Sequence, residues 1–107
     1  MPAYMITYLG GNHPSNPEEG KRHFAKYQAW LQDLGEAAIS PANPLKNTRV
    51  VKPDGSVSDG SATSMSGFTI IKADSLAAAI EIARACPFLE IGGSLEVSEI
   101  LEMPSNK

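Results

Sequence analysis

The chain has 107 residues and a formal net charge of −3 at pH 7. This length suits one domain with a single core, which we place at residues 1–103 with a loose tail at 104–107. The acidic balance disfavours nucleic acid and anionic membranes as partners, because both require basic protein surface. A single cysteine, Cys86, excludes an intrachain disulfide framework. With no secretory signal and no membrane-spanning apolar run, the expected location is the cytoplasm.

The first predicted element is a strand over residues 3–9, with the sequence AYMITYL. Side chains alternate between the two faces of a strand, so Tyr4, Ile6 and Tyr8 share one face and Met5 lies on the other. Neither face is polar. A strand of this kind is usually covered on both sides.

A helix is predicted over residues 17–34. Asn16 can cap its start, Pro17 suits the first helical position, and Glu19 occupies the acidic position of a capping box. The apolar spacing of this helix predicts a buried stripe made of Phe24, Tyr27, Leu31 and Leu34.

The middle of the chain is predicted to contain a short strand over residues 36–40, which ends at Pro41. Residues 42–65 are rich in Pro, Gly, Ser, Asn and Asp, and we expect a small hairpin within them. Its strands would be residues 48–52 and 56–58, separated by a Pro-Asp-Gly turn.

The last third predicts a strand, a helix and a strand. The first strand covers residues 68–73, Asp74 and Ser75 can cap the helix, and Pro87 cannot continue it. The final strand covers residues 94–103. The periodicity places Leu76, Ala79, Ile80 and Ala83 on one face of this helix.

This order of elements predicts a ferredoxin-like α+β fold, with four antiparallel strands, two helices on one face and an inserted hairpin. Two helices cover only one face of such a sheet. Because the strands are apolar on both faces, we expect a second copy of the chain to cover the other face in a homodimer.

Several motifs together resemble the YCII-related (DGPF-domain) family. The pattern H-x-x-x-Y occurs at His23 and Tyr27, the segment GFTIIKADSL begins at Gly67, and G-x-x-E-V begins at Gly93. The D-G-P-F signature is reduced to Asp-Gly at Asp59, followed by Ser and Ala. The resemblance implies a dimeric α+β barrel. It also implies a His–Asp pair of the kind that some relatives use in lyase or dehalogenation chemistry.

His23 matches the helix histidine of that family, and Asp59 is the acidic residue that could orient it. Imidazole titrates near neutrality and can act as a general base. Each residue also has a simpler interpretation, since His23 could be a solvated side chain and Asp59 an ordinary turn residue. These two residues are the candidate catalytic pair.

Four further side chains are candidates for substrate binding. His13 lies in a loop, and Tyr27 and Trp30 follow His23 at helical spacing. Glu99 is a carboxylate on an otherwise apolar strand face, and burial there would raise its pKa. We expect a pocket between the first helix, residues 10–14 and the Asp59 loop, with residues 42–65 as a lid.

No metal or cofactor is expected. The two histidines and the single cysteine are widely separated, and the Gly-Gly pair at Gly10 lacks a phosphate-binding spacing. Two functions remain open. One is a small cofactor-independent enzyme that transfers a proton on a small organic molecule. The other is a non-catalytic dimeric domain that binds a small ligand or a partner segment.

Overall fold

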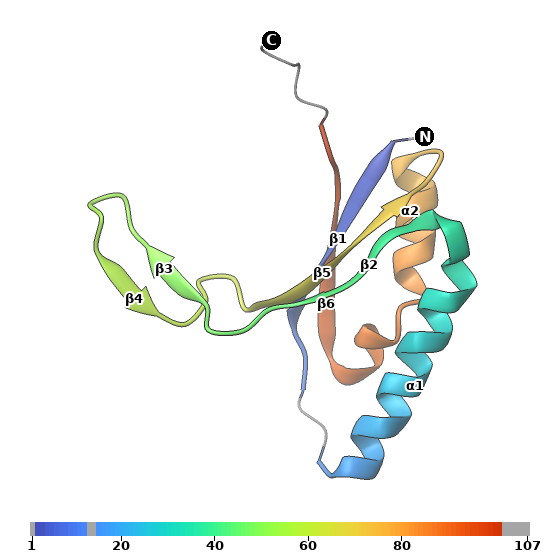
Figure 1. Cartoon of the computed structure of the whole chain (residues 1–107), viewed down its shortest axis with the longest axis horizontal. Coiled ribbons are helices and arrows are strands. Elements are labelled where there is room, and N and C mark those ends of the chain that lie inside the picture. Colours follow the sequence, from blue (N-terminus) through green and yellow to red (C-terminus); the bar gives the residue numbers. More distant parts are fainter. Residues whose placement is uncertain (1, 13–14, 102–107) are drawn as a thin grey trace.

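The computed structural model describes residues 2–12 and 15–101. A four-stranded antiparallel sheet has the order β2-β5-β1-β6, and two helices cover one of its faces (Figure 1). This arrangement confirms the ferredoxin-like α+β fold. The sheet and its helices comprise β1 (Ala3–Gly10), α1 (Pro17–Leu34), β2 (Ala38–Pro44), β5 (Met65–Lys72), α2 (Leu76–Arg84) and β6 (Gly93–Glu99). The predicted tail at 104–107 lies outside the described residues.

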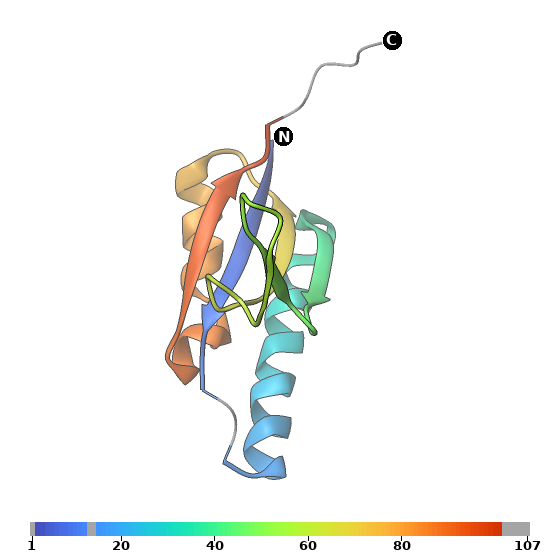
Figure 2. The ribbon, with the colours of Figure 1, turned by 90° about the vertical axis from the view of Figure 1, so that its left-hand side faces the viewer.

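The predicted hairpin is confirmed as a separate two-stranded sheet of β3 (Arg49–Val51) and β4 (Val57–Asp59). Asp54 Oδ1 accepts hydrogen bonds from the backbone N–H of Ser56 at 2.9 Å and from its hydroxyl at 2.7 Å, which fixes the turn and lowers the pKa of Asp54. Figures 1 and 2 show the hairpin projecting from the side of the main sheet opposite the helices.

Helix α1 begins and ends as predicted. The Asn16 side chain accepts a hydrogen bond from the Glu19 N–H at 2.8 Å, and Gly35 follows the last turn with φ of +53°. The predicted buried stripe is partly wrong. Phe24 is 58% exposed, whereas Trp30 is only 7% exposed. The first turns of α1 extend past the end of the sheet, so its C-terminal half carries the core contacts (Figure 1).

Helix α2 is capped by Ser75, whose hydroxyl accepts a hydrogen bond from the Ala78 N–H at 3.1 Å. Of the four residues predicted to share one face, Leu76 and Ile80 are 46% and 40% exposed. The buried residues are Ala79 and Ala83. The small side chains of Ala79 and Ala83 allow the backbone of α2 to lie close to the sheet. The larger side chains of Leu76 and Ile80 lie beside this contact and stay partly exposed.

Several strand boundaries differ from the prediction. Strand β5 begins at residue 65 and β6 ends at residue 99. Strand β2 starts later and runs longer than predicted, because residues 35–37 form the short helix η1 (Gly35–Ala37). Pro41 does not end β2, since β2 is an edge strand and its register shifts between Ser40 and Asn43. A proline is tolerated at such an irregularity because no ladder hydrogen bond is lost there.

The core lies between the sheet and the helices. It contains the alternate residues Tyr4, Ile6 and Tyr8 of β1, together with Trp30 and Ile71. On the opposite side of the sheet, which we call the open face, the central strands place Met5 beside Ile70 and Thr7 beside Phe68. No helix among the described residues covers the open face (Figure 2).

Cys86 precedes η2 (Pro87–Ile91) and is buried, and this burial raises the pKa of its thiol to about 11. We therefore expect the folded protein to react very slowly with a thiol reagent at pH 7.5, because the thiolate is the reactive form. A raised pKa stabilises the fold below the unfolded value of 9.0, and this contribution is lost as the pH rises towards 11. The labelling rate of Cys86 is measured by absorbance at pH 7.5, with urea-unfolded protein as the control. Equal labelling rates for the two samples would contradict it.

Candidate functional site

A cavity of about 280 Å³ lies between α1, β2, the start of β5 and η2. Its walls are mainly apolar and include Phe24, Ala42, Pro44, Gly67 and Phe88. These residues come from four separate parts of the chain, so the cavity exists only in the folded protein. Cavities of this kind typically bind small molecules through apolar walls and a few polar groups.

Two glycines set the shape of the cavity. A Cβ atom on Gly67 would lie 2.9 Å from the backbone oxygen of Asn43, so a side chain there would push β2 away from β5. A Cβ atom on Gly93 would overlap the ring of Phe88. Glycine at these positions therefore allows β2 to pair closely and Phe88 to lie on the cavity wall.

A chain of hydroxyl groups connects the cavity to the sheet. The hydroxyl of Tyr8 contacts that of Thr69 and lies 2.9 Å from that of Tyr27, and Thr69 donates to the backbone oxygen of Pro41 at 2.7 Å. Burial raises the pKa of Tyr8 far above its ordinary value, although the Thr69 hydrogen bond opposes this effect. The Tyr8 phenol is therefore neutral and keeps its hydrogen.

His23 lies on the cavity wall, one residue before Phe24. A different carboxylate from the expected one lies near it. Lys26 forms an ion pair with Glu90 at 2.8 Å and lowers the pKa of Glu90, and His23 adds a smaller contribution of the same sign. No hydrogen bond joins His23 to a carboxylate within residues 2–12 and 15–101.

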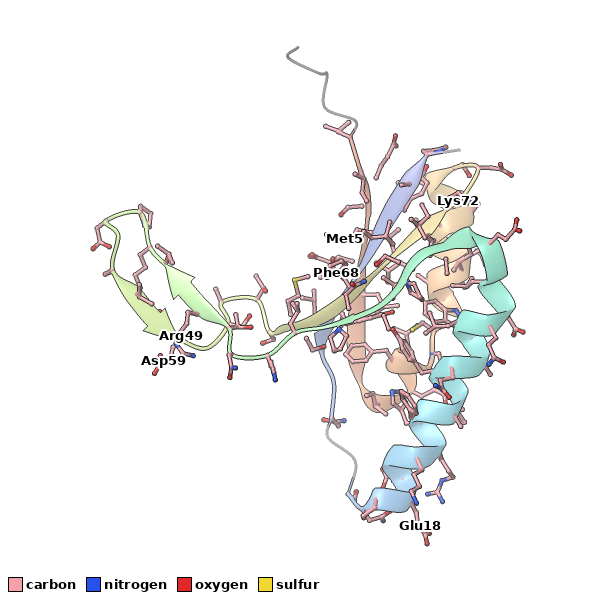
Figure 3. The ribbon with its side chains drawn as sticks, in the orientation of Figure 1. Met5, Glu18, Arg49, Asp59, Phe68 and Lys72 are labelled. Carbon is pink, nitrogen blue, oxygen red and sulfur yellow. The ribbon has the colours of Figure 1, made fainter. Side chains whose placement is uncertain are left out.

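Asp59 lies at the end of β4, where its Oδ1 is 3.1 Å from Nε of Arg49 on the paired strand. Figure 3 shows both residues on the projecting hairpin, away from α1. The fold of a single chain therefore does not bring Asp59 to His23. The acidic residue that sequence reasoning assigned to the site is engaged in a pair across the hairpin instead.

The other candidates are divided. Tyr27 lines the cavity, but Trp30 lies in the core, where its Nε1–H donates to the backbone oxygen of Ile82 at 3.1 Å. Glu99 is exposed at the end of β6, opposite Tyr4, whose pKa is raised by burial and further by the charge of Glu99. His13 lies outside the described residues.

The family model of the YCII-related domain matches residues 3–104. The chain belongs to the YCII-related family. The match covers nearly the whole chain and confirms the resemblance that its motifs suggested. No curated protein matches the chain.

Sequence reasoning missed the cavity residues Asn43 and Phe88 of this YCII-related chain, and also Thr69, whose hydroxyl contacts that of Tyr8 behind the cavity wall. Thr69 carried a usable signal, since it is a hydroxyl residue inside an apolar strand and buried hydroxyls require partners. Asn43 lies at an irregular part of β2 and Phe88 in the short helix η2. In such segments the sequence has no periodic pattern from which the direction of a side chain could be predicted. In the part of the chain that the structure describes, no cluster of three possible metal ligands occurs. No helix in that part is both long and apolar enough to cross a membrane.

Proposed function

We propose that this YCII-related chain binds a small, mainly apolar molecule in the cavity between α1, β2 and η2. The cavity itself is the observation that carries the proposal. Its volume of about 280 Å³ is near the lower end of the range of about 300–1,000 Å³ for small-molecule sites. A single substituted ring is of suitable size. Covering its apolar surface contributes about 25 cal/mol per Å².

The second candidate is a cofactor-independent enzyme in which His23 moves a proton to or from that molecule. This function is favoured by the position of His23 on the cavity wall. A general base must lie within about 3.2 Å of the proton it transfers, and a carboxylate normally orients it. Glu90 is the carboxylate whose pKa reflects His23, but its direct partner is Lys26. Binding without catalysis is therefore the better supported function.

The proposal includes a homodimer that covers the open face of each sheet. The centre of that face is apolar, with Met5 beside Ile70, and Phe68 lies next to them on β5. Lys72 at one end of the face and Glu96 on β6 carry opposite charges. A two-fold axis can place the positive end of one copy against the negative edge of the other.

The ligand proposal is tested by titrating benzofuran into ¹⁵N-labelled full-length protein. We expect millimolar binding with amide shifts concentrated at Gly67, Phe88 and His23. Ala42→Trp fills the cavity and should weaken this binding at least tenfold. Ala77→Trp, an equal enlargement at an exposed position of α2, should leave it unchanged.

Shifts confined to α2 and β6, or equal affinities for the two variants, would show that benzofuran binds elsewhere. A pH titration of the His23 ring signals, with and without benzofuran, tests the second candidate. A change in the pH response of those signals favours the proton-transfer candidate, and an unchanged response favours simple binding.

A further inference from the structure

The hydroxyl chain at the cavity has a fixed direction, which starts at Pro41. The register shift in β2 between Ser40 and Asn43 leaves Pro41 without a ladder partner on β5. Its backbone oxygen accepts a hydrogen bond from the buried Thr69 hydroxyl at 2.7 Å. A carbonyl oxygen carries no hydrogen, so Thr69 must be the donor in this contact.

Two further short contacts join Tyr8 to Thr69 and Tyr8 to Tyr27. Their direction follows from counting hydrogens, since each hydroxyl has only one. Because Thr69 donates its hydrogen to the backbone oxygen of Pro41, Tyr8 must be the donor in its close contact with Thr69. Tyr8 has then used its hydrogen, so across the 2.9 Å contact Tyr27 must donate to Tyr8. The Tyr27 hydroxyl also lies 3.3 Å from that of Thr69 and 3.5 Å from the backbone oxygen of Pro41, but both contacts are longer, and a hydrogen directed to either would still stay within the chain.

Tyr27 is the member of this chain that a ligand can reach. Tyr8 and Tyr27 both line the cavity, but Tyr27 is half-buried, whereas Tyr8 and Thr69 are buried. Because the Tyr27 hydrogen is committed to Tyr8, any hydrogen bond between its oxygen and a ligand must be one that the oxygen accepts. A ligand that needs a donor from Tyr27 would have to break the chain.

Other polar groups on the cavity wall also use their hydrogens within the protein. The Asn43 amide donates to the Ser40 hydroxyl at 2.9 Å and to the backbone oxygen of Phe68 at 3.1 Å, so both of its hydrogens are used. The Ser66 hydroxyl donates to the backbone oxygen of Tyr8 at 3.5 Å. Among the polar side chains that the structure describes on this wall, His23 donates to none of the others and so keeps a hydrogen for a ligand.

We infer that the ligand is a compact apolar ring compound whose N–H or O–H group donates a hydrogen bond to the oxygen of Tyr27. This inference rests on the proposed function, because it assigns the ligand class of the same cavity. The ring would lie against Phe24, Pro44 and Phe88 while its donor faces Tyr27. An otherwise identical ring without the donor would lose one hydrogen bond.

Indole and benzofuran form the matched test pair, because they have the same shape and differ in one N–H group. In NMR titrations of the full-length protein, indole should bind about threefold to tenfold more tightly than benzofuran, as expected for one net hydrogen bond. Tyr27→Phe keeps the ring and removes the accepting oxygen. In this variant the two affinities should become equal, at the value for benzofuran.

Each outcome decides the inference. Benzofuran binding as tightly as indole to the native protein would overturn it, while the ligand-binding function would stand. If neither indole nor benzofuran binds, the inference and the ligand-binding function are both overturned. A preference for indole that survives in Tyr27→Phe would also overturn it, because another group would then be the acceptor. If Tyr27→Phe fails to fold, 1-methylindole serves with the native protein and should bind no better than benzofuran.

Discussion

Replacing Trp30 with alanine should lower the free energy of unfolding by about 3–5 kcal/mol. The indole is only 7% exposed and lies against the ring of Tyr27, with the ring centroids 5.8 Å apart. It also satisfies the backbone oxygen of Ile82 at 3.1 Å. The substitution therefore creates a cavity and removes one of the two hydrogen bonds to the Ile82 oxygen, which also accepts from the Ala85 N–H at 3.2 Å, and both effects destabilise the fold.

The matched control is Phe24→Ala on the same helix, which should cost less than about 1 kcal/mol because that ring is 58% exposed. Urea unfolding followed by far-UV circular dichroism is the suitable measurement, since Trp30 is the single tryptophan of the chain. Equal losses for the two variants would contradict the assignment of Trp30, and not Phe24, to the core.

Ile70→Glu should convert the proposed homodimer into a monomer. Light scattering on the native protein should give about twice the chain mass of 11.4 kDa at micromolar concentration. Ile70 lies on the open face beside Met5, so its replacement by glutamate would place a charge at the centre of an apolar interface. A desolvated charge without a partner costs several kcal/mol, which is enough to dissociate a dimer of moderate affinity.

Ile80→Glu is the control for this experiment. It makes the same chemical change at a residue that is 40% exposed on α2, in the helical layer on the other side of the sheet. This variant should remain dimeric. A native protein that is monomeric across the micromolar range would refute the dimer, and dissociation of both variants alike would show that the open face is not the interface.

The limits of both helices could be predicted because their signals are local. Asn16 and Ser75 cap the two starts through their own side chains. Gly35 ends α1 at a positive φ, and Pro87, which cannot extend α2, begins the short helix η2 instead. The choice of buried residues could not be predicted in the same way. Helical periodicity gives one apolar stripe, but the partner layer decides which part of it is covered.

The candidate site shows the same division. The sequence indicated His23 and Tyr27, and both line the cavity. It also paired His23 with Asp59, but the hairpin that carries Asp59 projects away from α1 and pairs this residue with Arg49 (Figure 3). Chain order alone does not tell on which side of a sheet an inserted hairpin will project.

By itself, the sequence determined the order of the elements, the α+β class and membership of the YCII-related family, because capping, periodicity and family motifs are properties of neighbouring residues. Tertiary structure alone decided the direction of the hydroxyl chain. That chain joins Tyr8, Tyr27, Thr69 and Pro41, which come from β1, α1, β5 and β2. Each hydrogen bond depends on the position of the next group, so the hydrogen of Tyr27 is committed to Tyr8 only once all four elements have packed together.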